Sequence, residues 1–140
     1  MNWNISTILG FSDNMESGPG SWAPTSLWHL EPTQSNSPTT SWTYNTGSPS
    51  YNFNIGSNSG SLTSEVIDIS GAGPSDTTLL TFFCYYQTET SGTSYDQRWI
   101  QISANGGPFT NFLQLSGETM NSWHQHQLNI SVYNCDSIRV

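Results

Sequence analysis

A tryptophan with amide neighbours is the most suggestive chemical feature of this sequence. Strand alternation along residues 96–103 places Trp99 on one face with Gln97 and Gln101, and two isoleucines on the other. Such a group suits a sugar, because the C–H face of a pyranose packs on the indole while amides hydrogen-bond to its hydroxyl groups. The pattern predicts a carbohydrate-binding site at these three residues. The alternative is that a second layer covers this face and Trp99 belongs to the core.

Four acidic residues are candidate ligands of a metal ion, namely Asp13, Glu16, Glu89 and Asp96. Calcium binds several hard oxygen atoms, and separate loops can bring these together. The sequence has no Asp-x-Asp-x-Asp loop, which would supply most of the ligands locally. The candidate cofactor is therefore a structural calcium ion with no catalytic role.

Histidines and cysteines offer two further possibilities. His124 and His126 share a face of a predicted strand, and a His-x-His pair can bind a metal. Amide-rich surroundings and the lack of a nearby third ligand favour packing or surface histidines instead.

Cys84 and Cys135 are the two cysteines of the chain. They predict one disulfide, as in extracellular proteins, or else two separate buried thiols.

Charge and motifs narrow the function classes. The 140 residues contain 2 Lys or Arg against 10 Asp or Glu, for a formal net charge of −8. Nucleic acids and anionic lipids require a basic surface, so both are excluded as main partners. No stretch approaches the roughly 18 apolar residues of a membrane span. Glycosidase-like carboxylate pairs, a Gly-x-Ser-x-Gly elbow and a His-Glu-x-x-His motif are absent, so we expect no enzyme.

The elements that position these residues are predicted to be strands. The chain is 34% hydrophobic, 13% aromatic and 9% charged, which is typical of a folded β-rich domain and not of a disordered one. Short apolar runs between Gly, Pro, Asn and Ser clusters predict an all-β, two-sheet antiparallel jelly-roll sandwich. The strand at 79–87 is apolar on both faces, so we expect both faces to be covered. The other predicted strands are 26–30, 40–44, 51–55, 61–69, 96–103, 123–130 and 137–140.

The order of several segments resembles a known family. The segments are 11–18, 27–30, 41–44, 60–70, 100–107 and 128–133. Their succession is similar to the bacterial MAM-like jelly roll, found beside immune-inhibitor-A metalloproteases and in many secreted multidomain proteins. The resemblance implies a concanavalin-A-like sandwich, an extracellular location, and binding or adhesion in place of catalysis. It also implies that Trp28 and Trp42 are core residues.

One departure from that family bears on the domain boundaries. The family continues past the strand matched by 138–140 with a further strand, and this sequence does not. An open sandwich leaves unpaired strand edges. Three explanations fit: the chain is a fragment, residues 3–9 supply a replacement strand, or a neighbouring copy donates one. We therefore expect one jelly-roll domain over 1–140, with 1–10 a candidate extra or exchanged strand.

These features lead to two functional hypotheses from different classes. The first is a non-catalytic binding or adhesion module, secreted or on the cell surface, that binds a glycan or a cell-surface glycoconjugate. The second is a structural subunit of an extracellular fibre, filament or coat, assembled by strand donation between copies of the chain. A weaker third interpretation is an accessory domain of a secreted protease or glycosidase.

Overall fold

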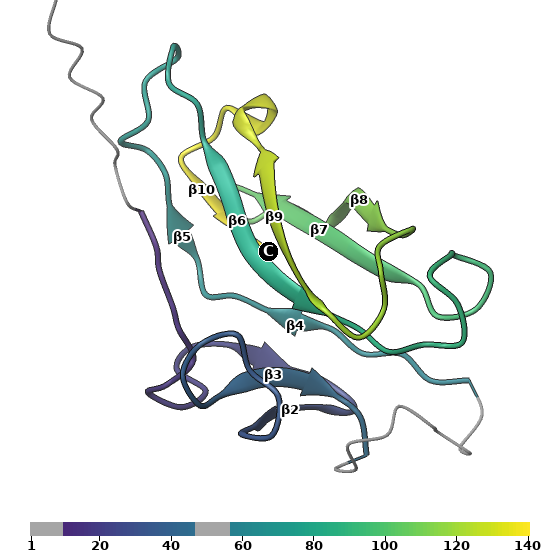
Figure 1. Cartoon of the computed structure of the whole chain (residues 1–140). Coiled ribbons are helices and arrows are strands. Elements are labelled where there is room, and N and C mark those ends of the chain that lie inside the picture. The colour runs from purple at the N-terminus through teal and green to yellow at the C-terminus, as the bar shows by residue number, and fades with distance from the viewer. Residues whose placement is uncertain (1–9, 47–56) are drawn as a thin grey trace, which may run out of the picture.

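The chain is an all-β protein, as Figure 1 shows for residues 10–46 and 57–140, which the computed structural model describes. The predicted strand at 51–55 and the segment 3–9 lie outside this range. A single turn of 3-10 helix covers Ser131–Tyr133. The strands of the described part are β1 (Ala23–Pro24), β2 (Trp28–Glu31), β3 (Ser41–Tyr44), β4 (Leu62–Thr63), β5 (Ile67–Asp68), β6 (Leu79–Tyr85), β7 (Arg98–Ala104), β8 (Thr110–Leu115), β9 (Trp123–Asn129) and β10 (Ser137–Arg139).

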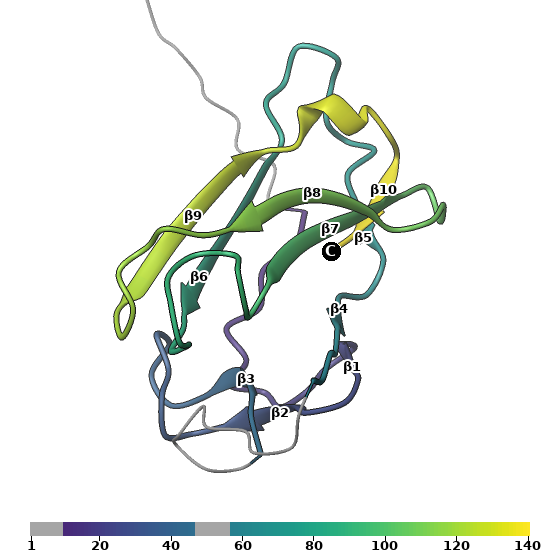
Figure 2. The same cartoon turned by 90° about the vertical axis from the view of Figure 1, so that its right-hand side faces the viewer.

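The strands pair into antiparallel sheets of unequal size. One sheet has four strands in the order β5-β10-β7-β8, and β6 pairs with β9. Figure 2 shows these as two facing layers, with β2 and β3 below them. Two small pairs, β1-β4 and β2-β3, complete the described part. The predicted all-β class is confirmed, and the jelly-roll topology stays a prediction.

The space between the two layers holds the core. Its buried centre consists of Ile67, Ile102, Ile130 and Ile138, which come from or adjoin the four-stranded sheet and the end of β9. Leu80 of β6 and Leu128 of β9 pack against this centre from the other layer. Ile102 is fully buried. Because side chains alternate along a strand, an inward Ile102 requires Trp99 and Gln101 to face outward.

The outer face of β6 corrects one prediction. The two-sided apolar pattern predicted cover on both faces, but Leu79 and Phe83 are each 47% exposed. The inward residues Leu80 and Phe82 are half-buried against the core layer. In the described part of the chain β6 pairs only with β9, and no second layer covers its outer side. A strand with two apolar faces is therefore buried on one of them here.

The strand β8 was missed by sequence reasoning. It follows β7 through a tight turn in which Asn105 and Gly106 both have positive φ, 46° and 72°. The N–H of Gly107 donates to the carbonyl oxygen of Ala104 at 2.9 Å and closes this turn, which lies within the longer connection 105–109. The pairing shifts at a bulge between Ile100 and Gln101, so the apolar residues of β8 do not alternate regularly. A bulge hides the period of two on which strand prediction depends.

Candidate functional site

Trp99 lies on the outer face of the four-stranded sheet and not in the core. Its side chain is 41% exposed. The indole Nε1–H donates a hydrogen bond of 3.2 Å to the Oε1 atom of Gln97, two residues earlier on the same face. This bond uses the one polar atom of the ring and fixes its orientation. The ring is thus held in place while much of its surface remains open to solvent.

Amides of β7 and β8 surround this ring. The Nε2 atom of Gln101 donates to Oδ1 of Asn111, 2.8 Å away on the neighbouring strand. Gln114 is the cross-strand partner of Trp99. We call Trp99, Gln97, Gln101, Asn111 and Gln114 the Trp99 platform. Sequence reasoning found three of its members, and it missed Asn111 and Gln114 because it missed β8.

The amides of the Trp99 platform can form hydrogen bonds and carry no charge. Each carboxamide carries two N–H donors and a carbonyl acceptor, and the two bonds above use only part of this capacity. None of the five side chains ionises. The nearest cation along β7, Arg98, points to the opposite face and stacks on Tyr86, with its Cζ atom 3.3 Å from the ring centroid. The platform therefore offers one aromatic surface bordered by uncharged donors and acceptors.

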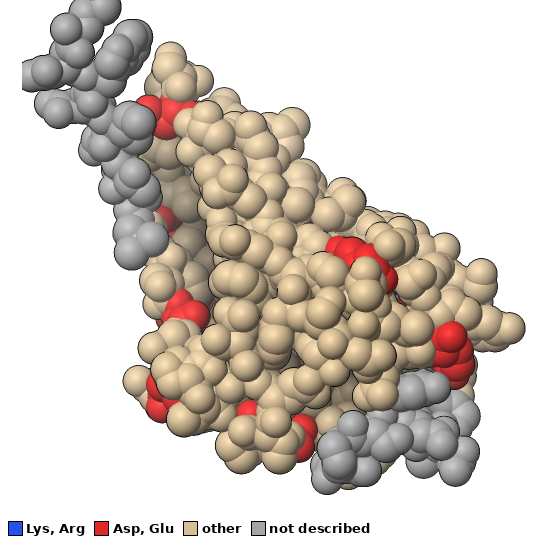
Figure 3. Space-filling view, in the orientation of Figure 1, with Lys and Arg blue, Asp and Glu red and all other residues tan. Residues whose placement is uncertain are grey.

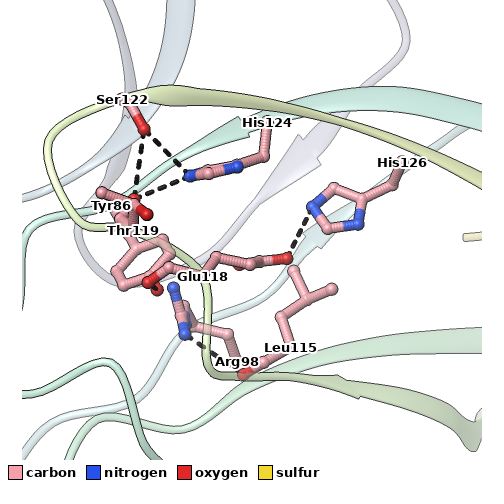
Figure 4. Close-up of polar contacts among 8 residues, drawn as sticks. All are labelled: Tyr86, Arg98, Leu115, Glu118, Thr119, Ser122, His124 and His126. Atoms are coloured by element: carbon pink, nitrogen blue, oxygen red, sulfur yellow. Dashed lines mark hydrogen bonds and ion pairs between the residues drawn. The ribbon is translucent and has the colours of Figure 1, made fainter.

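The inner side of the same region holds a group of polar residues, drawn in Figure 4. His126 lies 3.0 Å from a carboxylate oxygen of Glu118 and stacks on Phe82, with ring centroids 4.8 Å apart. His124 contacts the carbonyl oxygen of Thr119 at 2.7 Å. Both histidines are thus half-buried residues that connect β9 to the loop before it. These contacts agree with the packing interpretation.

The N-terminal acidic residues fasten loops. Asp13 accepts hydrogen bonds from the backbone N–H of Met15 at 2.7 Å and from the indole N–H of Trp22 at 3.0 Å. Glu16 accepts bonds from the hydroxyl and backbone N–H of Thr39, and further ones from residues 37 and 40. The bonds from Thr39 lower the pKa of Glu16 to about 2, because they stabilise the carboxylate.

The other two predicted calcium ligands meet each other. Glu89 and Asp96 share a side-chain hydrogen bond, which raises the pKa of Asp96 and lowers that of Glu89. Across residues 10–46 and 57–140, no three His, Cys, Asp or Glu side chains converge on one point. The four predicted ligands therefore do not form a single cluster. Calcium binding at either pair stays a prediction.

The predicted disulfide is not formed, since Cys84 and Cys135 are both free thiols. Cys84 lies near the C-terminal end of β6, six residues beyond Thr78. The backbone N–H of Thr78 donates a hydrogen bond to the side-chain hydroxyl of Ser131. Six strand residues span about 20 Å. Cys135 is close to Ser131 in the chain, at the opposite end of β6, and a disulfide requires Cα atoms within about 7 Å. Burial raises the pKa of Cys84 to about 11.

Comparisons with protein-family models, curated proteins and solved structures returned no match. The resemblance to the MAM-like jelly roll therefore stays a prediction. In the described part of the chain, no helix is long and apolar enough to cross a membrane.

Proposed function

We propose that this protein is a non-catalytic, extracellular carbohydrate-binding module with a jelly-roll sandwich, and that the Trp99 platform is its binding site. One observation carries the proposal: a half-exposed indole is fixed by Gln97 among uncharged amides. A pyranose ring would pack on the indole. The amides of Gln101, Asn111 and Gln114 would bind the hydroxyl groups at the edge of the sugar.

The charge of the protein narrows the ligand class. With a net charge of −8 and no lysine, the protein repels acidic glycans at low ionic strength. The five residues of the Trp99 platform include no arginine that could pair with a sulfate, uronate or sialate group. Arg98 lies on the inner face, and the exposed Arg139 lies on β10 opposite Ser103, beyond Gln101. Neutral polysaccharides or the neutral part of a surface glycoconjugate are therefore the proposed ligands.

The same geometry argues for binding over hydrolysis. A glycosidase uses two carboxyl groups that are about 5–9.5 Å apart on either side of the scissile bond. The Trp99 platform contains none. Glu89 and Asp96 are hydrogen-bonded to each other. Their carboxyl groups are therefore closer together than those of a retaining or an inverting glycosidase. The proposed role is therefore recognition without bond cleavage.

The test compares two equally exposed aromatic residues. Trp99 and Phe109 are each 41% exposed, but Phe109 lies in the β7–β8 turn outside the Trp99 platform. Soluble β-1,3-glucan, xyloglucan and galactomannan would be screened by affinity electrophoresis. Trp99→Ala is expected to weaken binding at least about tenfold, equal to about 1.4 kcal/mol, whereas Phe109→Ala leaves it unchanged. A loss of more than about 1 kcal/mol in unfolding free energy for Trp99→Ala would contradict a surface role.

A specific observation also favours the structural-subunit hypothesis. Within the described residues, β6 and β9 pair only with each other, so each has one edge of unpaired backbone groups. Such edges can accept a strand from another copy. Light scattering over a range of concentrations tests this. Large species that persist in the wild type and are lost when residues 1–9 are deleted support strand donation from that segment. A monomer of 15.5 kDa at every concentration contradicts it.

A further inference from the structure

The second layer also has an outer face, on the other side of the core from Trp99. Along β6 and β9, four outward-facing pairs lie side by side in register, the first of them Leu79 with Asn129. We call the other three the β6–β9 face, which consists of Thr81 with Gln127, Phe83 with Gln125, and Tyr85 with Trp123.

Aromatic surface is concentrated on the β6–β9 face. Phe83 is 47% exposed. Tyr85 and Trp123 are half-buried and contact each other, with ring centroids 5.5 Å apart and planes tilted by 51°. Neighbouring outward residues on one strand are about 6.8 Å apart, so Phe83 adjoins this ring pair. Phe83, Tyr85 and Trp123 thus form an aromatic strip along the strands, of which Tyr85 and Trp123 are in ring contact. An exposed apolar patch on a sheet is a candidate binding region.

Amides border the strip on one side. Gln125 lies directly opposite Phe83, and Gln127 opposite Thr81, both exposed. No member of the β6–β9 face is acidic or basic. Figure 3, drawn from the side on which β6 and β9 lie in front, shows acidic residues scattered singly and no Lys or Arg. An uncharged surface of rings and amides matches a neutral ligand that has apolar C–H faces and many hydroxyl groups.

We infer that the β6–β9 face is a second carbohydrate site, which takes an extended neutral polysaccharide along the strands. This inference rests on the proposed function and deepens it. Three aligned pairs extend over about 14 Å, which is more than one sugar ring covers. The Trp99 platform presents one ring, and the β6–β9 face presents a strip. With a site on each outer face, one molecule joins two polysaccharide chains.

The test uses the full chain and four variants with the polysaccharide that the wild type binds best. Phe83→Ala removes the exposed ring of the strip, and Trp99→Ala removes the other site. The double variant combines them. Val132→Ala is the control, because Val132 is 78% exposed in the 3-10 turn outside both surfaces. Affinity is measured by electrophoresis, cross-linking by turbidity, and the solution mass by light scattering.

Two results are expected. The wild type and Val132→Ala make the polysaccharide solution turbid, and either single variant abolishes the turbidity while still binding. The double variant binds at least about fivefold more weakly than Trp99→Ala alone. Loss of turbidity in each single variant, together with the further loss of affinity in the double variant, is expected only if the two faces are separate sites.

Other results overturn the inference. If Phe83→Ala matches the wild type in affinity and turbidity, the β6–β9 face is not a glycan site, although the Trp99 site stands. If Phe83→Ala converts a dimer to a monomer with binding unchanged, the face belongs to a second copy of the chain. If Trp99→Ala is the variant without effect, the proposed site fails and Phe83 alone carries binding. If no polysaccharide is retained, both proposals fail.

Discussion

The two outer faces of this protein place aromatic residues on a sheet in different ways. On the Trp99 platform a single indole is tied to Gln97, and Gln101 is tied to Asn111. On the β6–β9 face Tyr85 and Trp123 contact each other, and the exposed glutamines 125 and 127 border the rings. The first arrangement fixes one ring in a preformed polar frame, and the second gives a longer and less specific aromatic strip. The two faces therefore differ in both the number of rings and the polar contacts that fix them.

Both faces depend on one core. The inward residues of β6 and β7 pack around the four buried isoleucines, so damage to this centre disturbs both layers. Substitutions on either face are expected to change binding with little effect on stability.

The largest effect is expected from the core. Ile102 is fully buried, and Ile102→Ala should lower the free energy of unfolding by about 2–5 kcal/mol, because it removes apolar contacts and leaves a cavity. Urea denaturation measures this change, with exposed Val132→Ala as the control. Both binding modes should weaken together in Ile102→Ala. A loss below about 1 kcal/mol would show that the two layers do not share this core.

A smaller effect should separate the two faces. Gln101→Ala removes an amide that donates to Asn111, and the loss of one hydrogen bond to a sugar should weaken binding about 3- to 10-fold. Gln127→Ala is the matched amide substitution on the β6–β9 face. Affinity electrophoresis in a Trp99→Ala background distinguishes them. There, Gln101→Ala should have no further effect and Gln127→Ala should weaken the remaining binding; the reverse order would contradict the assignment.

Acid should affect the fold and spare both faces. The folded pKa of Glu16 is about 2, below its ordinary value of 4.5. Its contribution to stability is therefore complete above about pH 4.5 and is lost as the pH falls from there towards 2. The difference in melting temperature between the wild type and Glu16→Gln should be larger at pH 6 than at pH 3. An equal difference at both values would show that the bonds from Thr39 do not depend on charge.

The smallest expected effect concerns the reactivity of the Cys84 thiol, which lies on the inner side of β6, beneath the β6–β9 face. Burial raises the pKa of Cys84 to about 11, so little thiolate exists at pH 8. In a Cys135→Ser background, Cys84 should react with iodoacetamide only when the protein is unfolded. Phe83→Ala should leave this protection intact, since Phe83 faces outward. Rapid labelling of the native protein, detected by mass spectrometry, would show that β6 is not packed as described.

Sequence reasoning succeeded where strands alternate regularly. The outward position of Trp99 with Gln97 and Gln101 follows from the buried Ile102, and the structure has the same arrangement. Sequence reasoning failed where the exposure or pairing of a strand depends on its neighbours in the fold. The bulge within β8 concealed Asn111 and Gln114. The exposed side of β6 looked like a covered one, because Leu79 and Phe83 are as apolar as core residues.

Long-range pairings were also beyond the sequence. Cys84 and Cys135 lie at opposite ends of β6, and only the register of β6 with β9 shows this. The four acidic residues form no single cluster, since Asp13 binds within its own loop and Glu16 binds Thr39 in the loop before β3. Residue type alone therefore identified candidates, and strand register decided which of them meet.

The most direct test of the central claim is a nuclear magnetic resonance titration of the full chain with an oligosaccharide of the polysaccharide that it binds. The chain has six tryptophans, and each gives a separate indole N–H signal. We predict that the indole signal of Trp99 and the side-chain amide signals of Gln97, Gln101 and Asn111 shift, while those of Trp28 and Trp42 do not. Saturable shifts that leave Trp99 and its neighbouring amides unchanged would contradict the account.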